Sequence, residues 1–105
     1  MTLIAGILEE ELERLESLLK QREERLSAYP RGSVRIKKIG EREYLYRVYR
    51  ERSKIISEYL CSRTSPKAKH YLKENSARQE LKKSIKEIRT DIFDIGKSLE
   101  KLRRK

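Results

Sequence analysis

The sequence predicts an α+β fold, in which two long helices form an antiparallel coiled-coil pair and a small three-stranded antiparallel β-meander is inserted between them. Three observations support this prediction. Apolar residues recur at heptad spacing towards both ends of the chain. The stretch 32–60 holds four of the six tyrosines and alternates apolar and polar residues instead. Charged residues make up 42% of the chain, which suits helices that bury only a narrow stripe.

The first predicted helix covers residues 3–28. Apolar residues occupy two positions of its heptad repeat, and Arg22 is the one charged residue at these positions. Proline at position 30 ends the helix, because the residue before a proline is pushed out of the α region. The stripe consists of Ala5, Leu8, Leu12, Leu15, Leu19, Leu26 and Tyr29.

Three strands fit the middle of the chain, because tyrosine, valine and isoleucine at this density favour strands. They are predicted at 33–39, 43–49 and 54–60, with turns at 40–42 and 50–53. Alternation gives each strand two faces. We expect one face to be buried against a helix end and the other to point outwards. The buried set is Val34, Ile36, Tyr44, Tyr46 and Val48, and the outward set is Arg35, Lys37, Arg47 and Tyr49.

The second predicted helix has the most regular pattern in the chain. Seven aliphatic residues follow a strict 4-3 spacing: Leu81, Ile85, Ile88, Ile92, Ile95, Leu99 and Leu102. The helix starts either at Ser65, a suitable N-cap before Pro66, or at Ser76 after a break near Asn75. We expect it to pair with the first helix within the chain. The alternative is that it pairs with a second copy, and a homodimer built through the heptad helices is compatible with both.

The length of 105 residues favours one domain, with the first helix at 1–29, the meander at 30–64 and the second helix at 65–105. The sequence has no apolar run of membrane-spanning length and no secretory signal pattern. Its one cysteine, Cys61, cannot form an internal disulfide. These features predict a cytoplasmic protein without a membrane partner.

Catalytic chemistry finds little support in the sequence, so we expect no enzyme activity, no catalytic residues and no cofactor. His70 is the only histidine and has no neighbouring cluster of metal-ligating residues, so no metal site is predicted. Cys61 has no base placed in the sequence to activate it, which favours a structural thiol. The glycines at positions 32 and 40 are typical of turns and do not form a phosphate-binding loop.

Positive charge is the strongest functional feature of the sequence. The formal charge of +10 is divided into −3 for residues 1–28, +6 for 29–65 and +7 for 66–105. Basic residues of the meander alternate with tyrosines, a combination that can neutralise phosphates and stack on bases. The candidate nucleic-acid-binding residues are Arg31, Arg35, Lys37, Lys38, Arg47, Tyr49, Arg50, Arg52 and Lys54. The alternative is that the basic residues protect strand edges from aggregation and the tyrosines form a small core.

The central segment resembles an uncharacterised family of small prokaryotic proteins, largely archaeal, which is built as a helix, a meander and a further helix. The residues that carry the resemblance are Pro30-Arg31-Gly32-Ser33, Lys37-Lys38-Ile39-Gly40, Tyr44-Leu45-Tyr46, Tyr49-Arg50-Glu51, Lys54 and Ser57-Glu58-Tyr59-Leu60. This resemblance implies an architecture and no activity.

The Gly32-Ser33 start and the strand Tyr44-Leu45-Tyr46-Arg47-Val48 are also similar to the three-stranded arm-binding domain of tyrosine recombinases. That likeness implies a sheet placed in a DNA groove, with Arg35, Lys37, Arg47 and Tyr49 as contact residues. The sequence therefore predicts a small nucleic-acid-binding or DNA-associated accessory protein, with DNA favoured over RNA. The alternative is a structural or protein-interaction module that binds no nucleic acid.

Overall fold

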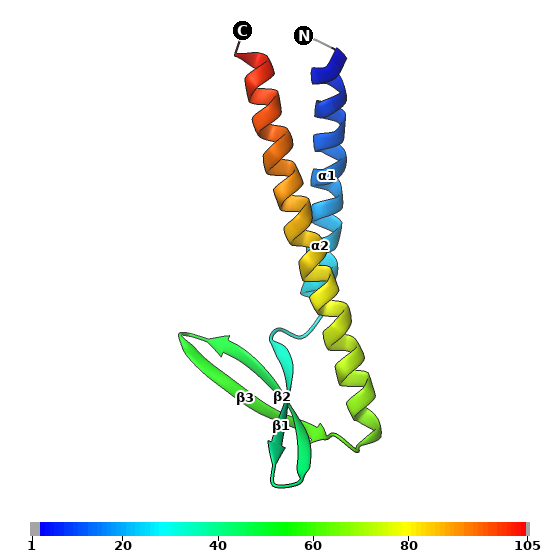
Figure 1. Ribbon diagram of the computed structural model, residues 1–105, viewed down its shortest axis with the longest axis vertical. Helices are drawn as coiled ribbons and strands as arrows, with labels where there is room; N and C mark the ends of the chain where they lie inside the picture. The colour runs from blue at the N-terminus through cyan, green and yellow to red at the C-terminus, as the bar shows by residue number, and fades with distance from the viewer. Residues whose placement is uncertain (1–2, 105) are drawn as a thin grey trace. The chain divides into compact units, whose positions relative to one another are not determined.

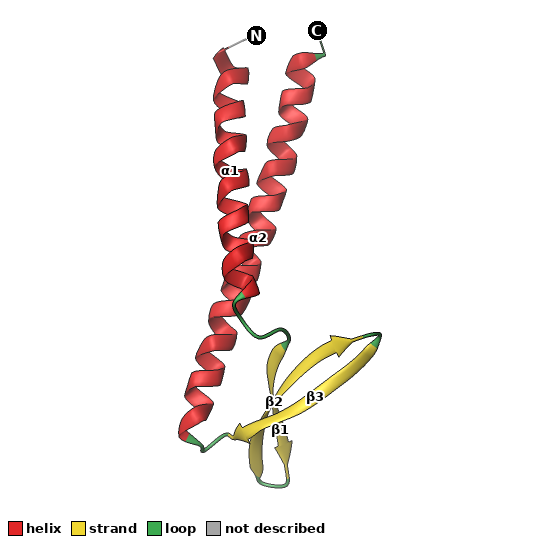
Figure 2. Ribbon diagram, turned by 180° about the vertical axis from the view of Figure 1, so that it is seen from behind, coloured by secondary structure: helices red, strands yellow, loops and turns green. Residues whose placement is uncertain are grey.

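The computed structural model describes residues 3–104 and confirms the predicted α+β fold, with a three-stranded antiparallel meander between two helices (Figure 1, Figure 2). The elements in chain order are α1 (Leu3–Ser27), β1 (Ser33–Ile39), β2 (Arg42–Glu51), β3 (Lys54–Ser62) and α2 (Pro66–Arg103). The chain divides into two compact units. One is formed by residues 29–79, which comprise the sheet and the first part of α2. The other combines residues 1–28, with α1, and residues 80–105, with the rest of α2.

Helix α1 and the part of α2 in the same unit, from Glu80 to Arg103, run antiparallel to each other, as predicted. The Arg89 guanidinium donates a hydrogen bond to the Glu23 carboxylate at 3.2 Å, and Arg103 donates to Glu9 at 2.6 Å. The two partners on α1 are separated by fourteen residues, and so are the two partners on α2. Because fourteen residues are two heptads, the helices keep one register over this distance.

Side chains of the predicted heptad stripes form the core of this helix pair. The buried members are Ala5, Leu15, Leu81, Ile85, Ile88 and Leu99. Ile92 and Ile95 are half-buried, and Leu102, predicted in the same stripe, is 39% exposed. Arg22 is half-buried in its stripe, and its buried Nε has no hydrogen-bond partner.

The sheet has the strand order β1-β2-β3, with β2 in the centre. Ser33 lies opposite Val48 in the first pairing, and Glu51 lies opposite Lys54 in the second. A β-bulge interrupts the second pairing, where Leu45 faces Cys61 and Tyr46 faces Tyr59. The intervening residue of β3, Leu60, therefore has no direct partner on β2, and its side chain packs at the edge of the core.

One face of the sheet packs against the first part of α2. Its centre is Leu45, which is fully buried, together with Val34, Cys61 and Ala68. The half-buried side chains of Leu60, Tyr71 and Leu72 surround this cluster. Cys61 therefore acts as a small apolar residue of the core, which agrees with the structural thiol expected from the sequence.

The predicted assignment of the two sheet faces was correct for β1 and wrong for β2. Residues directly opposite each other in an antiparallel pair have side chains on the same face. Val34 lies opposite Arg47 and Ile36 opposite Leu45, so these residues share the face that α2 covers. Tyr44, Tyr46 and Val48 point to the other face, together with Arg35 and Lys37.

Helix α2 starts at Pro66, which decides between the two predicted starts. The Lys67 backbone N–H donates to Ser65 Oγ at 3.3 Å, the hydrogen bond expected of an N-cap. Asn75, which suggested a helix break, lies inside α2, and its Oδ1 accepts a hydrogen bond from the Val34 N–H at 2.9 Å. One turn further along, Arg78 donates to the Gly32 carbonyl at 2.7 Å. Two polar side chains of α2 thus hold the start of β1.

Gly32 is expected to be the glycine least tolerant of substitution. Its φ is +94°, and a Cβ there would lie 2.4 Å from the Val48 carbonyl oxygen and 2.8 Å from Tyr49 Cβ. Gly40 is the matched control, because its φ is +65° but a Cβ there would meet nothing within 4 Å. Gly40→Ala should cost about 1–2 kcal/mol from the left-handed backbone alone. Gly32→Ala should lower the free energy of unfolding by clearly more than this, as measured by urea unfolding. Equal losses in the two variants would contradict the close approach of Gly32 to Val48 and Tyr49.

Ile88→Asp should destabilise the helix pair by at least about 3 kcal/mol, because it places an unpaired charge in an apolar seam. Ile88 is 6% exposed. Ser98→Asp adds the same charge at an exposed position of the same helix and should stay within about 0.5 kcal/mol of the parent. Urea unfolding followed by circular dichroism measures both variants. Similar stabilities for the two would mean that Ile88 does not pack in the seam.

Candidate nucleic-acid interface

The sheet has one face covered by α2 and a second face that no element of the same unit covers, which we call the open face. Cross-strand pairing decides which side chains belong to it. Its members are Ser33, Arg35, Lys37, Ile39, Arg42, Tyr44, Tyr46, Val48, Arg50, Ile55, Ser57, Tyr59 and Ser62. None of them is fully buried, and Tyr59 is 56% exposed. The open face is therefore accessible within the sheet unit.

The acidic residues of the strands are confined to one face of the sheet, whereas the basic residues occur on both. All acidic residues of the three described strands lie on the covered face, each directly opposite a basic residue. The pairs are Glu43 with Lys38, Glu58 with Arg47, and Glu51 with Lys54. The strand residues of the covered face thus include three acidic and three basic side chains, and their charges sum to zero.

The open face carries only positive charge. Its basic side chains are Arg35, Lys37, Arg42 and Arg50, and none of the described strand residues adds a carboxylate to this face. All four residues are exposed to solvent. The alternation along β2 contributes to this pattern, because both of its glutamates occupy odd-numbered positions and two of its three arginines occupy even-numbered ones.

Basic and aromatic side chains on the open face are arranged in rows across the strands. Arg35 on β1 lies opposite Tyr46 on β2, which in turn lies opposite Tyr59 on β3. In the neighbouring row, Lys37 lies opposite Tyr44. In these two rows the cationic residues therefore lie on β1, and the tyrosines lie on β2 and β3.

The three tyrosines form one cluster. The Tyr46 and Tyr59 ring centroids are 5.6 Å apart with planes at 66°, and those of Tyr44 and Tyr59 are 6.2 Å apart at 58°. Lys37 reaches across β2, so that its Nζ lies 4.5 Å from the Tyr46 ring centroid and donates to Ser57 Oγ at 2.9 Å. An ammonium group thus lies among the rings in the middle of the open face, held by a cation–π contact.

Three of the predicted site residues, Arg35, Lys37 and Arg50, lie on the open face. The outward orientation expected for Arg47 and Tyr49 was wrong, because both lie on the face covered by α2. The Arg47 side chain is only 12% exposed and lies 3.5 Å from the Glu74 carboxylate. The register of β1 against β2 is the physical reason, and it cannot be derived from the alternation within either strand.

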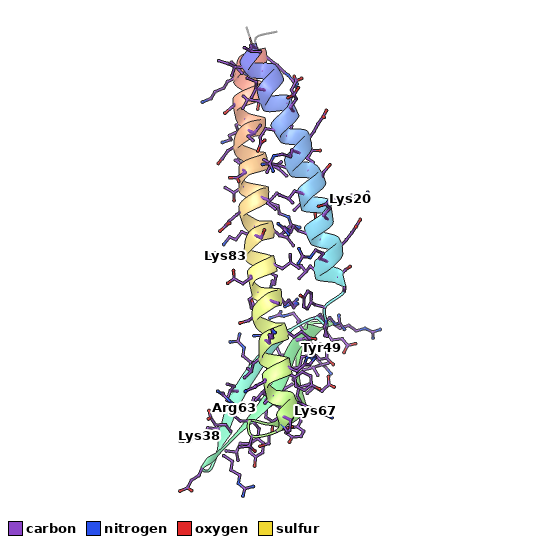
Figure 3. All side chains as sticks on the ribbon, turned by 90° about the vertical axis from the view of Figure 1, so that its right-hand side faces the viewer. Lys20, Lys38, Tyr49, Arg63, Lys67 and Lys83 are labelled. Atoms are coloured by element: carbon purple, nitrogen blue, oxygen red, sulfur yellow. The ribbon has the colours of Figure 1, made fainter. Side chains whose placement is uncertain are left out.

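The other predicted residues lie away from this cluster. Arg31 precedes β1, with its guanidinium over the Tyr49 ring, 5.3 Å from the centroid. Arg52 lies in the turn between β2 and β3 and has a positive φ of 49°. Lys38, labelled in Figure 3 near the other turn, and Lys54 lie opposite glutamates on the covered face.

Sequence reasoning missed the tyrosines of the open face and left Arg42 out of the site. Tyr44 and Tyr46 were assigned to the buried face because they alternate in step with Val48 along β2. The available signal was that Arg42, Tyr44, Tyr46 and Arg50 all occupy even-numbered positions. This alternation places four residues suited to a polyanion on one face of one strand.

Other kinds of site have less support in the described residues. Within residues 3–104, no three histidine, cysteine, aspartate or glutamate side chains gather closely enough to hold a metal ion. The His70 side chain is 74% exposed, and its Nε2 lies 3.7 Å from the Glu74 carboxylate. Neither described helix has a stretch apolar enough to cross a membrane.

The fold and this face define a helix–meander–helix protein with a basic, tyrosine-bearing sheet. The chain belongs to the family defined by the domain of unknown function DUF6788, which matches residues 8–70. The match extends from the second turn of α1 through the whole sheet into the start of α2, and it agrees with the predicted resemblance to an uncharacterised family. No curated protein and no solved structure matches the chain.

Proposed function

We propose that this protein binds nucleic acid through the open face of its sheet. The net charge supports this proposal. Residues 29–79 contain 14 basic and 5 acidic side chains, a net charge of +9, whereas the two segments of the helix pair contain 13 and 12, a net charge of +1. Nearly all of the excess positive charge therefore belongs to the unit with the sheet. A polyanion would be attracted to that unit and hardly at all to the helix pair.

The observation that carries the proposal is that all strand glutamates lie on the covered face and none on the open face. Lysine and arginine that serve only solubility do not require a face without glutamate. Here every strand glutamate lies opposite a basic residue on the covered face, and the open face keeps four uncompensated cations beside three tyrosines. Uncompensated cations neutralise phosphates, and tyrosines add stacking surface and hydroxyl groups. DNA remains the favoured nucleic acid, on the likeness of the strands to an arm-binding domain.

Replacing Arg35 and Lys37 together by glutamine should weaken nucleic-acid binding and lower its salt dependence. Each lost phosphate contact reduces the slope of log K against log salt by about 1, so the double variant should lose about 2. The matched control is Lys38→Gln with Lys54→Gln, which removes the same charge from the other face of the sheet. Its slope should change by much less. Fluorescence anisotropy over a salt series measures both.

Two results would contradict the proposal. Equal losses in the two double variants would mean that binding depends on total charge and not on the open face. Binding weaker than about 10⁻⁴ M to both duplex and single strands at low salt would remove the function itself, because non-specific binders usually exceed that affinity.

We propose self-association of the helix pair as a second candidate role, which corresponds to the structural alternative from the sequence. Large apolar side chains at the start of α1 are exposed, Leu3 by 82%, Ile4 by 62% and Ile7 by 56%. A second copy of this chain is the partner that we favour, because the helix pair has a net charge of only +1. Two such pairs would approach with little repulsion, unlike two sheet units.

Replacing Leu3 and Ile7 by glutamine should convert a dimer into a monomer without loss of helix content, because both side chains are exposed in the single chain. Light scattering coupled to size-exclusion chromatography measures the mass. Gln21→Ala, an exposed change further along α1, is the control and should leave the mass of the dimer unchanged. A parent protein that is monomeric at all accessible concentrations would rule out this role.

A further inference from the structure

The open face is asymmetric across its strands, and this asymmetry bears on which form of nucleic acid it fits. Arg35 and Lys37 project from β1, while Tyr46 and Tyr59 lie beside them on β2 and β3. Two residues along a strand are separated by about 6.8 Å. This separation is comparable with the distance between successive phosphates of an extended single strand. A backbone that follows β1 would therefore direct its bases over the tyrosines.

The ring geometry leaves aromatic surface for a base. Tyr59 meets Tyr46 and Tyr44 at interplanar angles of 66° and 58°, so none of these rings is stacked parallel on another. Tyr59 is also 56% exposed and lies on β3, an edge strand of the sheet. A flat partner can thus lie against its face. Bases in a duplex are already stacked on each other, so an exposed ring gains a stacking partner only from an unpaired base.

The strands lack the side chains that most often recognise adenine in a base pair. The described segment 33–62 contains neither asparagine nor glutamine, which form bidentate hydrogen bonds to adenine in the major groove. Serine and tyrosine accompany the cations on the open face instead. The arginines and the lysine of this face can bind phosphates or guanine edges, and the tyrosines add a stacking surface that is independent of base identity.

Lys37 connects the two halves of this surface. Its ammonium group lies over the Tyr46 ring and donates to Ser57. A phosphate near β1 would offer that ammonium a full negative charge, which is a stronger partner than a ring or a hydroxyl group. The movement of Lys37 towards the phosphate would uncover Tyr46 for a base.

We infer that the open face binds single-stranded nucleic acid, with the phosphates along β1 at Arg35 and Lys37 and the bases stacked on Tyr59 and Tyr46. This inference rests on the proposed function and specifies its ligand. The chemistry that it uses, a phosphate backbone with unpaired bases, is shared by single-stranded DNA and RNA.

The test compares three labelled probes by fluorescence anisotropy: a DNA single strand, the RNA strand of the same sequence, and the DNA duplex formed with the complement. We expect at least one single strand to bind about tenfold or more tightly than the duplex. Tyr59→Ala should weaken binding of that strand by about 5- to 150-fold, which corresponds to the loss of one base–ring stack. Binding of the duplex should change little.

Two controls separate stacking from other effects. Tyr59→Phe keeps the ring and should bind within about twofold of the parent, because stacking needs no hydroxyl group. Phe93→Ala removes a 61% exposed aromatic ring from α2, outside the sheet unit, and it should leave binding unchanged. Thermal unfolding of each variant shows whether the fold is intact, and Tyr59 is exposed enough for its loss to be tolerated.

Failure of the inference differs from failure of the proposed function. If the duplex binds as tightly as both single strands, or if Tyr59→Ala leaves their binding unchanged, the inference is overturned and the open face can still be a duplex-binding surface. If no probe binds more tightly than about 10⁻⁴ M at low salt, both are overturned. If the single strands do bind, comparing the DNA strand with the RNA strand identifies which backbone the open face prefers.

Discussion

The register of β2 against its two neighbours determines the chemistry of both faces of the sheet. Leu45, at the centre of β2, is the most deeply buried large side chain of the described residues, and α2 covers the face to which it points. A shift of one residue in this pairing would exchange the two faces. Glu43 and Glu51 would then lie on the open face, and Tyr44 and Tyr46 on the face that α2 covers. Burial of one leucine and accessibility of the cations are therefore parts of the same constraint.

Two features hold that register in place. The first is the start of β1, where Asn75 binds the Val34 N–H and Arg78 binds the Gly32 carbonyl. The second is the bulge in β3, which allows Cys61 to enter the core while Tyr59 reaches the open face. Without the extra residue at the bulge, the strict alternation of β3 would place these two side chains on the same face.

Local patterns in the sequence predicted the elements of the fold but not the pairing between them. The bounds of β1 agree with the prediction, and β2 and β3 are each longer by a few residues. Heptad spacing also located the buried residues of the helix pair, such as Leu81 and Ile85. Each of these features depends on residues that are close in the sequence, where propensity and periodicity decide the outcome.

The candidate site depended on contacts between distant residues, so only part of it could be predicted. Arg35, Lys37 and Arg50 were found because a basic strand is visible in composition alone. Arg47 was misplaced because its partner, Glu74, lies on α2, and no spacing rule connects the two positions. Asn75 was misinterpreted as a helix break for the same reason, since its acceptor oxygen bonds a residue 41 positions away.

The position of the single thiol gives the protein an internal reporter. Cys61 is 7% exposed and belongs to the same cluster as Leu45. An alkylating reagent can therefore attack its Sγ only when β3 separates from β2 or α2 lifts away from the sheet. Because the chain has no other cysteine, every labelled molecule records one such opening. The rate of labelling would report how often this small sheet opens locally.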